Sequence, residues 1–465
     1  MATGGAPFDA LSPLDPDTFA GESRAVINFL AGYYRDVETY PVQSQALPGC
    51  LRALLPDAPP ENGEPMDVIL EEVRTHIVPA LTHWQSPKFF GYFPMNASTA
   101  GFAGEMLSTG LNIVPFMRVA SPAATELEST VVDWMGKLVG LPDRFLFSGG
   151  GGGVLHGSTC EAVLSEQLKG AKISPRMAPP SAASSYGLTA ASVRDAVEAD
   201  VASGLVPLYL CATVGTTGLG AVDPVRDLGE LARRHGIWLH VDAAYAGSAL
   251  ICPEFQHHID GAELADSVSM NPHKWFLTNM DCCCLWVASP AALTSALSTN
   301  PEYLSNVTEE SAGAGVVDYK DWQIALSRPF RAMKLWLVLR RYGGAGMRAY
   351  VRRHVEMAKW FEQALEADGR FEVVAPTRFS LVTFRLRPRL EGDDDAVDAS
   401  NRGLLVAVNA SGRAFMTHFV VDGKFVIRMA VGGAMTEMQH VQDTWELVRE
   451  KAEEVGALQN ERNVR

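Results

Sequence analysis

The sequence predicts an α/β fold built on a mostly parallel sheet, because short apolar runs alternate with amphipathic segments through the middle of the chain. Residues 205–214 and 237–241 are apolar enough to form buried strands, and residues 224–235 between them have the pattern of a helix. Strands separated by helices pair in parallel through right-handed crossovers. The 465 residues suffice for two or three subdomains around a large core.

The first part of the chain, residues 15 to about 115, is predicted to be helical. The pair Asp15-Pro16 has the residue types that open a helix, and a second amphipathic helix is expected over residues 66–84. Residues 121–140 form the best delimited helix, with a serine cap, a proline at the first position and a closing glycine. A helical segment therefore precedes the α/β region.

The C-terminal part is predicted to be a smaller α+β region, with a helix over residues 348–365 followed by strands. The strands are expected at residues 371–374, 380–386, 416–420 and 424–429, and Val421-Asp422-Gly423 makes a hairpin turn. Another strand is expected at residues 282–287 of the α/β region. We therefore predict three regions: an N-terminal helical segment (1–115), a large α/β domain (116–344) and a small C-terminal α+β domain (345–465).

The composition argues against several function classes. A net charge of −15 disfavours nucleic acid and anionic membranes as partners, since both attract basic surfaces. The seven cysteines show no CxxC or zinc-type spacing, so no metal site is expected, and the run Cys282-Cys283-Cys284 is typical of reduced, buried thiols. The N-terminus shows no secretory signal and no apolar run is long enough to span a bilayer, so we expect a cytoplasmic protein.

Lys274 is the first candidate for chemistry. It lies in Ser269-Met270-Asn271-Pro272-His273-Lys274-Trp275, where aromatic and aliphatic neighbours predominate. Burial among such neighbours lowers the pKa of an amine, and a neutral amine is what Schiff-base formation requires. The alternative is a lysine that extends its ammonium group to water from a strand end, which is the more common situation for a single lysine.

Asp242 is the second candidate, because it follows the apolar strand 237–241 directly. In open α/β sheets ligands bind outside the carboxyl ends of the strands. A carboxylate there, followed by the small residues Ala243 and Ala244, suits a flat heteroaromatic ring that needs a counter-charge. The alternative is an aspartate that caps the next helix.

A glycine run, residues 148–153, continues to residues 157–162 and a predicted helix. Free backbone N–H groups and a helix N-terminus at Thr159 and Cys160 favour phosphate binding, although a glycine run by itself is more often a flexible loop. Thr213, at the end of a strand, is a further candidate cofactor contact, and its alternative role is simple strand propensity. Lysine, strand-end aspartate and phosphate loop together match what pyridoxal phosphate requires.

The stretches Asn271-Pro272-His273-Lys274-Trp275 and His240-Val241-Asp242-Ala243-Ala244-Tyr245 resemble the group II pyridoxal-phosphate decarboxylases, and most of all plant tryptophan and tyrosine decarboxylases. The resemblance extends from about Pro13 to about Gly456. It implies the aspartate aminotransferase fold (fold type I) and pyridoxal 5'-phosphate as cofactor. It also implies a homodimer with active sites at the subunit interface, clasped by the N-terminal helices, which could equally pack on their own domain.

The same resemblance assigns roles to further residues. Asn271 and His273 would hold the cofactor phosphate, although a histidine beside a proline turn can also be structural. The aromatic stretch that would line the substrate pocket, and could otherwise be ordinary core, comprises Trp84, Tyr92, Phe93 and Pro94. Tyr319, in a polar segment over residues 301–328, would lie on a loop that closes over the neighbouring subunit's site and would return a proton to the substrate carbon. Without the resemblance it would be an ordinary loop tyrosine.

The chain departs from the family over residues 165–185, which have the pattern of an irregular loop. Family members carry several tens of residues more here, including a strand and a histidine that stacks on the cofactor ring, whereas this chain has no histidine between His156 and His235. We expect an aromatic L-amino acid decarboxylase that converts tryptophan to tryptamine. The alternatives are a tyrosine or dopa decarboxylase and a catalytically impaired relative that lacks the stacking histidine.

Overall fold

The computed structural model describes residues 12–167, 176, 182–298, 317–387 and 394–463. The chain forms two compact units: unit 1 contains residues 1–89, 402–416 and 435–465, and unit 2 contains residues 90–401 and 417–434. In the part of the chain that the structure describes, no helix is both long enough and apolar enough to cross a membrane. The division into three regions drawn from the sequence stays a prediction.

Unit 1 begins with α1 (Pro16–Asp36), whose first turn is capped by Asp15 through a hydrogen bond of 2.9 Å from the Thr18 N–H. The predicted helix over 66–84 is shorter and less regular. The α-helix α2 (Met66–Glu72) continues as a π-helical turn (Val73–Ile77) and then a 3-10 turn (Val78–Ala80). Pro79 explains why the α-helix does not continue to residue 84, because proline lacks an N–H and its ring obstructs the preceding turn. The unit also contains α13 (Met438–Asn463).

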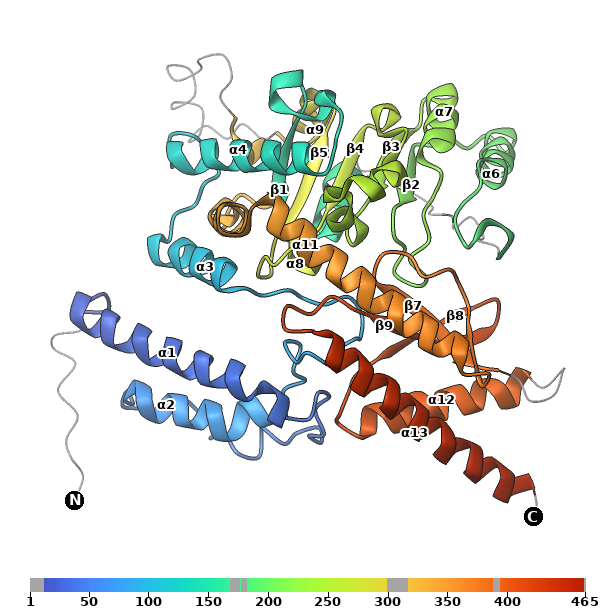
Figure 1. Cartoon of the computed structure of the whole chain (residues 1–465). Helices are drawn as coiled ribbons and strands as arrows, with labels where there is room; N and C mark the ends of the chain where they lie inside the picture. Colours follow the sequence, from blue (N-terminus) through green and yellow to red (C-terminus); the bar gives the residue numbers. More distant parts are fainter. Residues whose placement is uncertain (1–11, 168–175, 177–181, 299–316, 388–393, 464–465) are drawn as a thin grey trace. The chain divides into compact units, whose positions relative to one another are not determined.

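A five-stranded sheet forms the centre of unit 2 (Figure 1). Its strands are β1 (Gly152–His156), β2 (Tyr209–Thr213), β3 (Trp238–Asp242), β4 (Ser267–Met270) and β5 (Cys283–Val287). The order is β1-β5-β4-β3-β2, with β2, β3 and β4 parallel and β5 antiparallel to both of its neighbours. Four strands therefore point the same way, which confirms the predicted mostly parallel sheet. β2 starts later than predicted, after Pro207, which cannot donate to a strand ladder.

Helices cover this sheet and bury its apolar side chains. They are α4 (Pro122–Leu138), α5 (Thr159–Gln167), α6 (Ala190–Ala202), α7 (Val225–His235) and α9 (Pro290–Leu297). The core contains fully buried Val131 and Met135 from α4, Leu228 from α7 and Val241 from β3. Of these elements the apolar pattern predicts α4, β2, α7, β3 and β5, whereas β1 begins in the glycine run, where a loop is expected.

A second, antiparallel sheet in unit 2 has the order β6-β7-β9-β8. Its strands are β6 (Phe371–Val373), β7 (Leu381–Leu386), β8 (Thr417–Val421) and β9 (Lys424–Ala430). The predicted hairpin turn between β8 and β9 is confirmed, with Asp422 and Gly423 at φ values of 50° and 77°. Unit 2 also contains α3 (Thr99–Leu111), and α12 (Asp394–Ala410) lies on the sequence boundary of the units.

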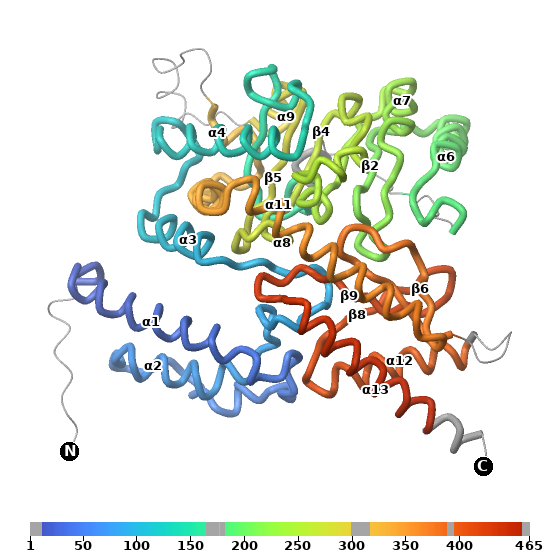
Figure 2. The backbone as a smooth tube through the Cα atoms, in the orientation of Figure 1, coloured from blue at the N-terminus to red at the C-terminus, as the bar shows by residue number. Residues whose placement is uncertain are grey.

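The long helix α11 (Arg331–Ala367) connects the two sheets of unit 2, as the orange part of the trace shows (Figure 2). It packs on α3 and α4 beside the five-stranded sheet and on β6 and β7 of the antiparallel sheet. The helix is interrupted at Gly343, which adopts φ 61° and ψ 167°, a conformation that only glycine adopts readily. The predicted helix over 348–365 is the second part of α11.

Candidate active site

Lys274 lies on α8 (Pro272–Trp275), the short helix that follows β4 directly. Its backbone N–H donates to the Asn271 carbonyl over 3.0 Å, so the lysine is held at the carboxyl end of the sheet. The side chain is half-buried, and its Nζ lies 5.5 Å from the centre of the Phe93 ring. Burial lowers the pKa of Lys274, against the opposing attraction of Asp242, Cys283 and Cys160. The predicted lowering is therefore confirmed in direction.

Asp242 is the last residue of β3 and pairs in register with Thr213 of β2 and Ser269 of β4. One carboxylate oxygen, Oδ1, accepts a hydrogen bond of 2.8 Å from the Ala244 N–H. The carboxylate is also close enough to Lys274 to raise that lysine's pKa. The carboxylate thus caps the turn that follows β3 and lies near the candidate lysine, and its role as counter-charge to a cofactor ring stays a prediction.

The start of α5 meets the start of α8 through two side chains. Thr159 Oγ1 donates to Asn271 Oδ1 over 3.0 Å. Cys160, the next residue of α5, is exposed and acts electrostatically on Lys274. The first turn of α5 therefore lies on the same side of the sheet as Lys274, where its backbone N–H groups favour an anion.

The glycine run itself is not the anion loop that the sequence suggested. Gly152 and Gly153 belong to β1, and only Gly157 lies between that strand and α5. A Cβ at Gly152 would collide with the Phe147 and Trp322 rings, and one at Gly153 with Val132 and with the Leu285 carbonyl. These two glycines are required by close packing on both faces of β1. Residues 168–175 and 177–181, which make up most of the predicted irregular loop, lie outside the described residues.

His273 is buried, and its Nδ1 lies 2.7 Å from the carbonyl oxygen of Cys282. Burial lowers the pKa of His273 to about 4, with Lys274 adding a smaller repulsion, so the ring is neutral near pH 7. Thr213 ends β2, and its N–H donates to Asp223 Oδ2 over 2.7 Å. Both residues have structural contacts here, and their predicted contacts with a cofactor stay predictions.

The predicted aromatic pocket residues differ in their surroundings. Phe93 is buried and stacks on Tyr245, with ring centres 3.8 Å apart, and Pro94 is also buried. Tyr92 is 52 % exposed. Trp84 belongs to unit 1, where it packs on Phe89 at 4.5 Å between ring centres. Within unit 2, Phe93 is the residue of this group that lies next to Lys274.

Tyr319 is fully buried in an apolar cluster with Val154, Leu285 and Trp322. The Arg328 guanidinium lies 4.8 Å above its ring, and burial raises the pKa of Tyr319 well above its usual range. Among the described residues the hydroxyl has no hydrogen bond of ordinary geometry, although Ser129 is near enough to oppose the rise in pKa slightly. Such a hydroxyl reaches no substrate unless it leaves this cluster. The proton-donor role therefore stays a prediction without support from this placement.

Three neighbours of the site were missed by the sequence reasoning. Cys283 pairs with His156 across β1 and β5, and its environment includes Lys274, Asp242 and Thr159. The Tyr245 ring stacks on Phe93, and its hydroxyl is 2.8 Å from Ser380 Oγ. Arg428 lies 5.4 Å from the centre of the Phe93 ring. The alternation of β5 could have placed Cys283, but no local signal identifies Arg428.

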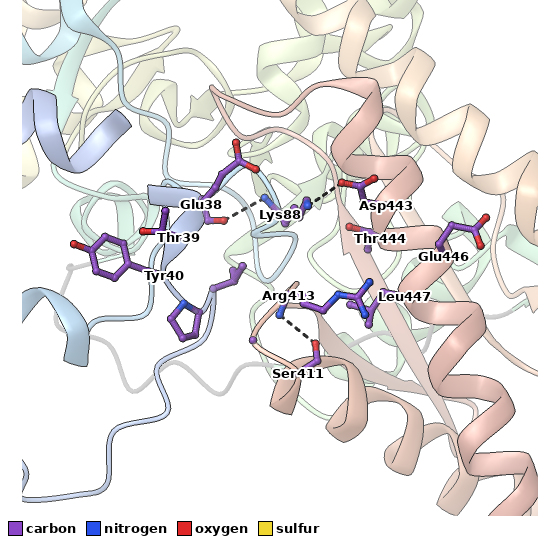
Figure 3. Close-up of a pocket in the computed structure, with 14 residues that line it drawn as sticks. Glu38, Thr39, Tyr40, Lys88, Ser411, Arg413, Asp443, Thr444, Glu446 and Leu447 are labelled. Carbon is purple, nitrogen blue, oxygen red and sulfur yellow. Dashed lines mark hydrogen bonds and ion pairs between the residues drawn. The ribbon is translucent and has the colours of Figure 1, made fainter. Parts of the chain in front are cut away.

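A pocket of about 450 Å³ in unit 1 contains none of these residues (Figure 3). In it Lys88 points toward Asp443, and the two form an ion pair of 2.9 Å. Arg413, on the same wall, is paired with Glu450 at 2.7 Å. Since both cations already have carboxylate partners, neither is free to pair with an anionic ligand. The candidate active site is the one around Lys274.

Comparisons with known proteins agree with this location. The family model described as "Pyridoxal-dependent decarboxylase conserved domain" matches residues 48–179 and 180–387, which include Lys274 and Asp242. This chain is a pyridoxal-dependent decarboxylase by family. Tyrosine decarboxylase 1 of Narcissus pseudonarcissus is 51 % identical over 95 % of this chain and 94 % of the relative. Phenylacetaldehyde synthase of a Rosa hybrid cultivar is 49 % identical over 95 % of each chain.

The structural comparison confirms the predicted fold of this pyridoxal-dependent decarboxylase. The crystal structure of Catharanthus roseus tryptophan decarboxylase in complex with L-tryptophan matches with a TM-score of 0.90 and 44 % identity, covering 96 % of this chain and all of that one (100 %). The fold is thus that of the type I pyridoxal-phosphate enzymes. The alignment with the Narcissus enzyme has 484 positions, more than the 465 residues of this chain, so that relative has residues without a counterpart here.

The residues at the site fit the family's cofactor, pyridoxal 5'-phosphate. Lys274 offers an amine with a lowered pKa, and Asp242 offers a carboxylate one strand away from it. The N-terminus of α5 offers backbone N–H groups beside Thr159. An amine, an anion and an anion-binding helix end are the three complements of an aldehyde, a pyridinium nitrogen and a phosphate.

Proposed function

We propose that this protein removes the carboxylate of an aromatic L-amino acid and releases the arylalkylamine and CO2. The observation that carries the proposal is the half-buried Lys274, whose pKa is lowered by burial, whose Nζ lies 5.5 Å from the centre of the Phe93 ring, and which is attracted by the Asp242 carboxylate. When bound, pyridoxal phosphate supplies the electron-accepting ring that stabilises the carbanion left by loss of CO2.

The chain's own residues divide the remaining tasks. Lys274 would hold the cofactor covalently through Nζ, and its lowered pKa favours the neutral amine that this bond requires. Asp242 would keep a proton on the ring nitrogen by offering it a carboxylate. The first turn of α5, with Thr159 and Cys160, would bind the phosphate together with Asn271, while Thr213 and His273 complete the proposed cofactor contacts.

The substrate side is proposed from the aromatic stretch. The buried Phe93 ring lies 5.5 Å from Lys274 Nζ, and it is proposed to contact the aromatic side chain of the substrate. Tyr92 and Pro94, which belong to the same unit, are proposed to extend this surface, and the predicted part of Trp84 in it stays a prediction. Tryptophan, with tryptamine as the product, is the first candidate substrate. Tyrosine is the second, and the 51 % identity to a tyrosine decarboxylase favours it. A cytoplasmic homodimer with sites at its interface belongs to the same proposal.

The decisive experiment combines a spectrum with product analysis. Purified protein is mixed with pyridoxal phosphate, its visible spectrum is recorded, and tryptophan and tyrosine are then supplied while amines and aldehydes are both quantified. We expect an absorbance band of the lysine-bound cofactor, a borohydride-fixed adduct on Lys274, and tryptamine or tyramine as products. Lys274→Arg should abolish both the band and the amine, and the matched change Lys137→Arg on the exposed face of α4 should alter neither.

Two other results would replace the proposal. Aldehyde in place of amine would assign the reaction of the phenylacetaldehyde synthases, to which the chain is also similar. A folded protein without the absorbance band would identify a relative that no longer holds the cofactor, as the absence of a histidine between His156 and His235 allows. If the protein converts tyrosine but not tryptophan, tyrosine is its substrate.

A further inference from the structure

Arg428 is a buried cation near the site, and in the part of the chain that the structure describes no carboxylate pairs with it. It lies in the middle of β9, 2 % exposed, between Thr383 of β7 and Thr417 of β8. Burial lowers the pKa of Arg428 to about 10, and among the described residues no Asp or Glu forms an ion pair with it. Burying a guanidinium without a carboxylate partner is unfavourable, so the hydrogen bonds of Arg428 must offset that cost.

Those contacts are three hydrogen bonds to neutral oxygens on three separate segments. Nε donates to the Gly218 carbonyl over 3.1 Å, Nη1 to Thr417 Oγ1 over 2.9 Å, and Nη2 to the Tyr92 carbonyl over 3.2 Å. The planar fork of arginine can make three such bonds in fixed directions, whereas a lysine cannot. Arg428 thus ties the stretch around Tyr92 to β8 and to the turn at Gly218.

Tyr92 is held in an unusual backbone conformation at this point. Its φ is +51°, a left-handed value that is disfavoured for a residue with a Cβ. Its N–H donates to Thr417 Oγ1 over 3.2 Å while its carbonyl accepts from Arg428. Thr417 Oγ1 therefore accepts from both Tyr92 N–H and Arg428 Nη1, and the Thr417 and Arg428 side chains together hold both peptide groups of Tyr92. The next residue, Phe93, is directed into the core against Tyr245.

We propose that Arg428 and Thr417 form a clamp that holds Tyr92 in this conformation and so positions the aromatic surface that receives the substrate side chain. The Phe93 ring lies 5.4 Å from Arg428 Cζ and 5.5 Å from Lys274 Nζ, so the clamp sets where the aromatic surface stands relative to the reacting lysine. Arg428 and Thr417 are positioning residues in this scheme. The inference rests on the proposed function, because it takes the surface at Tyr92 and Phe93 to be the substrate pocket.

The other use of an unmatched cation would be to bind the substrate's α-carboxylate, and the structure favours the clamp over it. A decarboxylase converts that carboxylate to neutral CO2, so an ion pair to it would stabilise the bound substrate more than the transition state and slow the reaction. In addition, three N–H groups of Arg428 already point at backbone and hydroxyl oxygens.

The test uses Thr417→Val and Arg428→Lys, with Thr130→Val on the exposed face of α4 as the matched control. The affinities of L-tyrosine and of tyramine are measured by calorimetry on protein in which borohydride has fixed the cofactor to Lys274. Loss of one hydrogen bond predicts affinities about 2- to 10-fold weaker, for both ligands alike, in both variants. In the unreduced enzyme KM should rise by the same factor while kcat changes less than about twofold.

The outcomes separate the alternatives. Unchanged affinity for both ligands would overturn the clamp, and weaker binding of tyrosine with unchanged binding of tyramine would assign Arg428 to the carboxylate instead. If the wild-type protein forms no amine, the proposed function fails. The clamp is then tested separately, by the thermal unfolding of variants. Thr417→Val should lower the midpoint of thermal unfolding less in a Tyr92→Gly background, because glycine adopts a positive φ without strain. An equal decrease in both backgrounds would contradict the clamp.

Discussion

Thr159 Oγ1 donates to Asn271 Oδ1 over 3.0 Å, and this bond joins the first residue of α5 to the residue that precedes α8. The helix end proposed to bind phosphate and the helix that carries Lys274 are therefore coupled directly. A displacement of α5 would therefore also displace α8, so we expect this bond to affect the affinity for the cofactor.

We predict that Thr159→Val weakens cofactor binding, because it removes this bond and leaves the Asn271 amide without that donor. The loss of a hydrogen bond of this kind corresponds to roughly 2- to 10-fold in the dissociation constant of pyridoxal phosphate. An absorbance titration of the cofactor-free protein measures it, with Thr130→Val as control. A dissociation constant equal to that of the wild type would show that the Thr159–Asn271 bond has no part in holding the cofactor.

A second prediction concerns Tyr319. Because its buried hydroxyl has no hydrogen bond of ordinary geometry among the described residues, we expect Tyr319→Phe to change the free energy of unfolding by less than about 1 kcal/mol, so that amine formation by this variant tests the proton-donor role separately. Removal of a general acid typically costs about 10²- to 10⁴-fold in rate. A decrease of that size in amine formation, without loss of stability, would show that Tyr319 leaves its cluster and donates the proton.

A third prediction concerns the buried ion pair between Glu128 and Arg328. Arg328 Nη1 and Nη2 donate to the two carboxylate oxygens over 2.8 and 2.5 Å, and Glu128 also accepts from the Leu155 N–H of β1 over 2.9 Å. Arg328→Met leaves the carboxylate buried without its cation, which predicts a loss of about 3 to 5 kcal/mol in unfolding free energy. Chemical denaturation measures it, and the double variant Glu128→Met/Arg328→Met should lose less. A larger loss in the double variant would contradict this account.

A fourth prediction concerns pH. The pKa of His273 is lowered from 6.5 to about 4 by burial, so the folded state binds a proton there less readily than the unfolded state. Its contribution to stability is complete above about pH 6.5 and is lost as the pH falls toward 4, to an extent on the order of 3 kcal/mol. The unfolding free energy, measured by denaturation between pH 7 and pH 4, should decrease less with falling pH for His273→Asn than for the wild type. His257→Asn, at an exposed histidine, is the control, and equal slopes in all three proteins would refute the prediction.

The sequence by itself determined the positions of β2, α7, β3 and the four strands of the antiparallel sheet, and the convergence of Lys274 and Asp242. Both follow from local rules: apolar periodicity selects the element, and the carboxyl ends of parallel strands meet at one edge of a sheet. The hairpin at Asp422-Gly423 and the cap at Asp15 are equally local, because neighbouring residues decide them.

Only the tertiary structure decided the roles of Gly152, Tyr319 and Arg428. Gly152 could have belonged to a flexible loop, but the Phe147 and Trp322 rings leave no space for a side chain there. The burial of Tyr319 depends on strands far away in the sequence, and Arg428 meets Tyr92 across 336 residues. Contacts of this kind arise from packing between elements, and no window of neighbouring residues carries the information that specifies them.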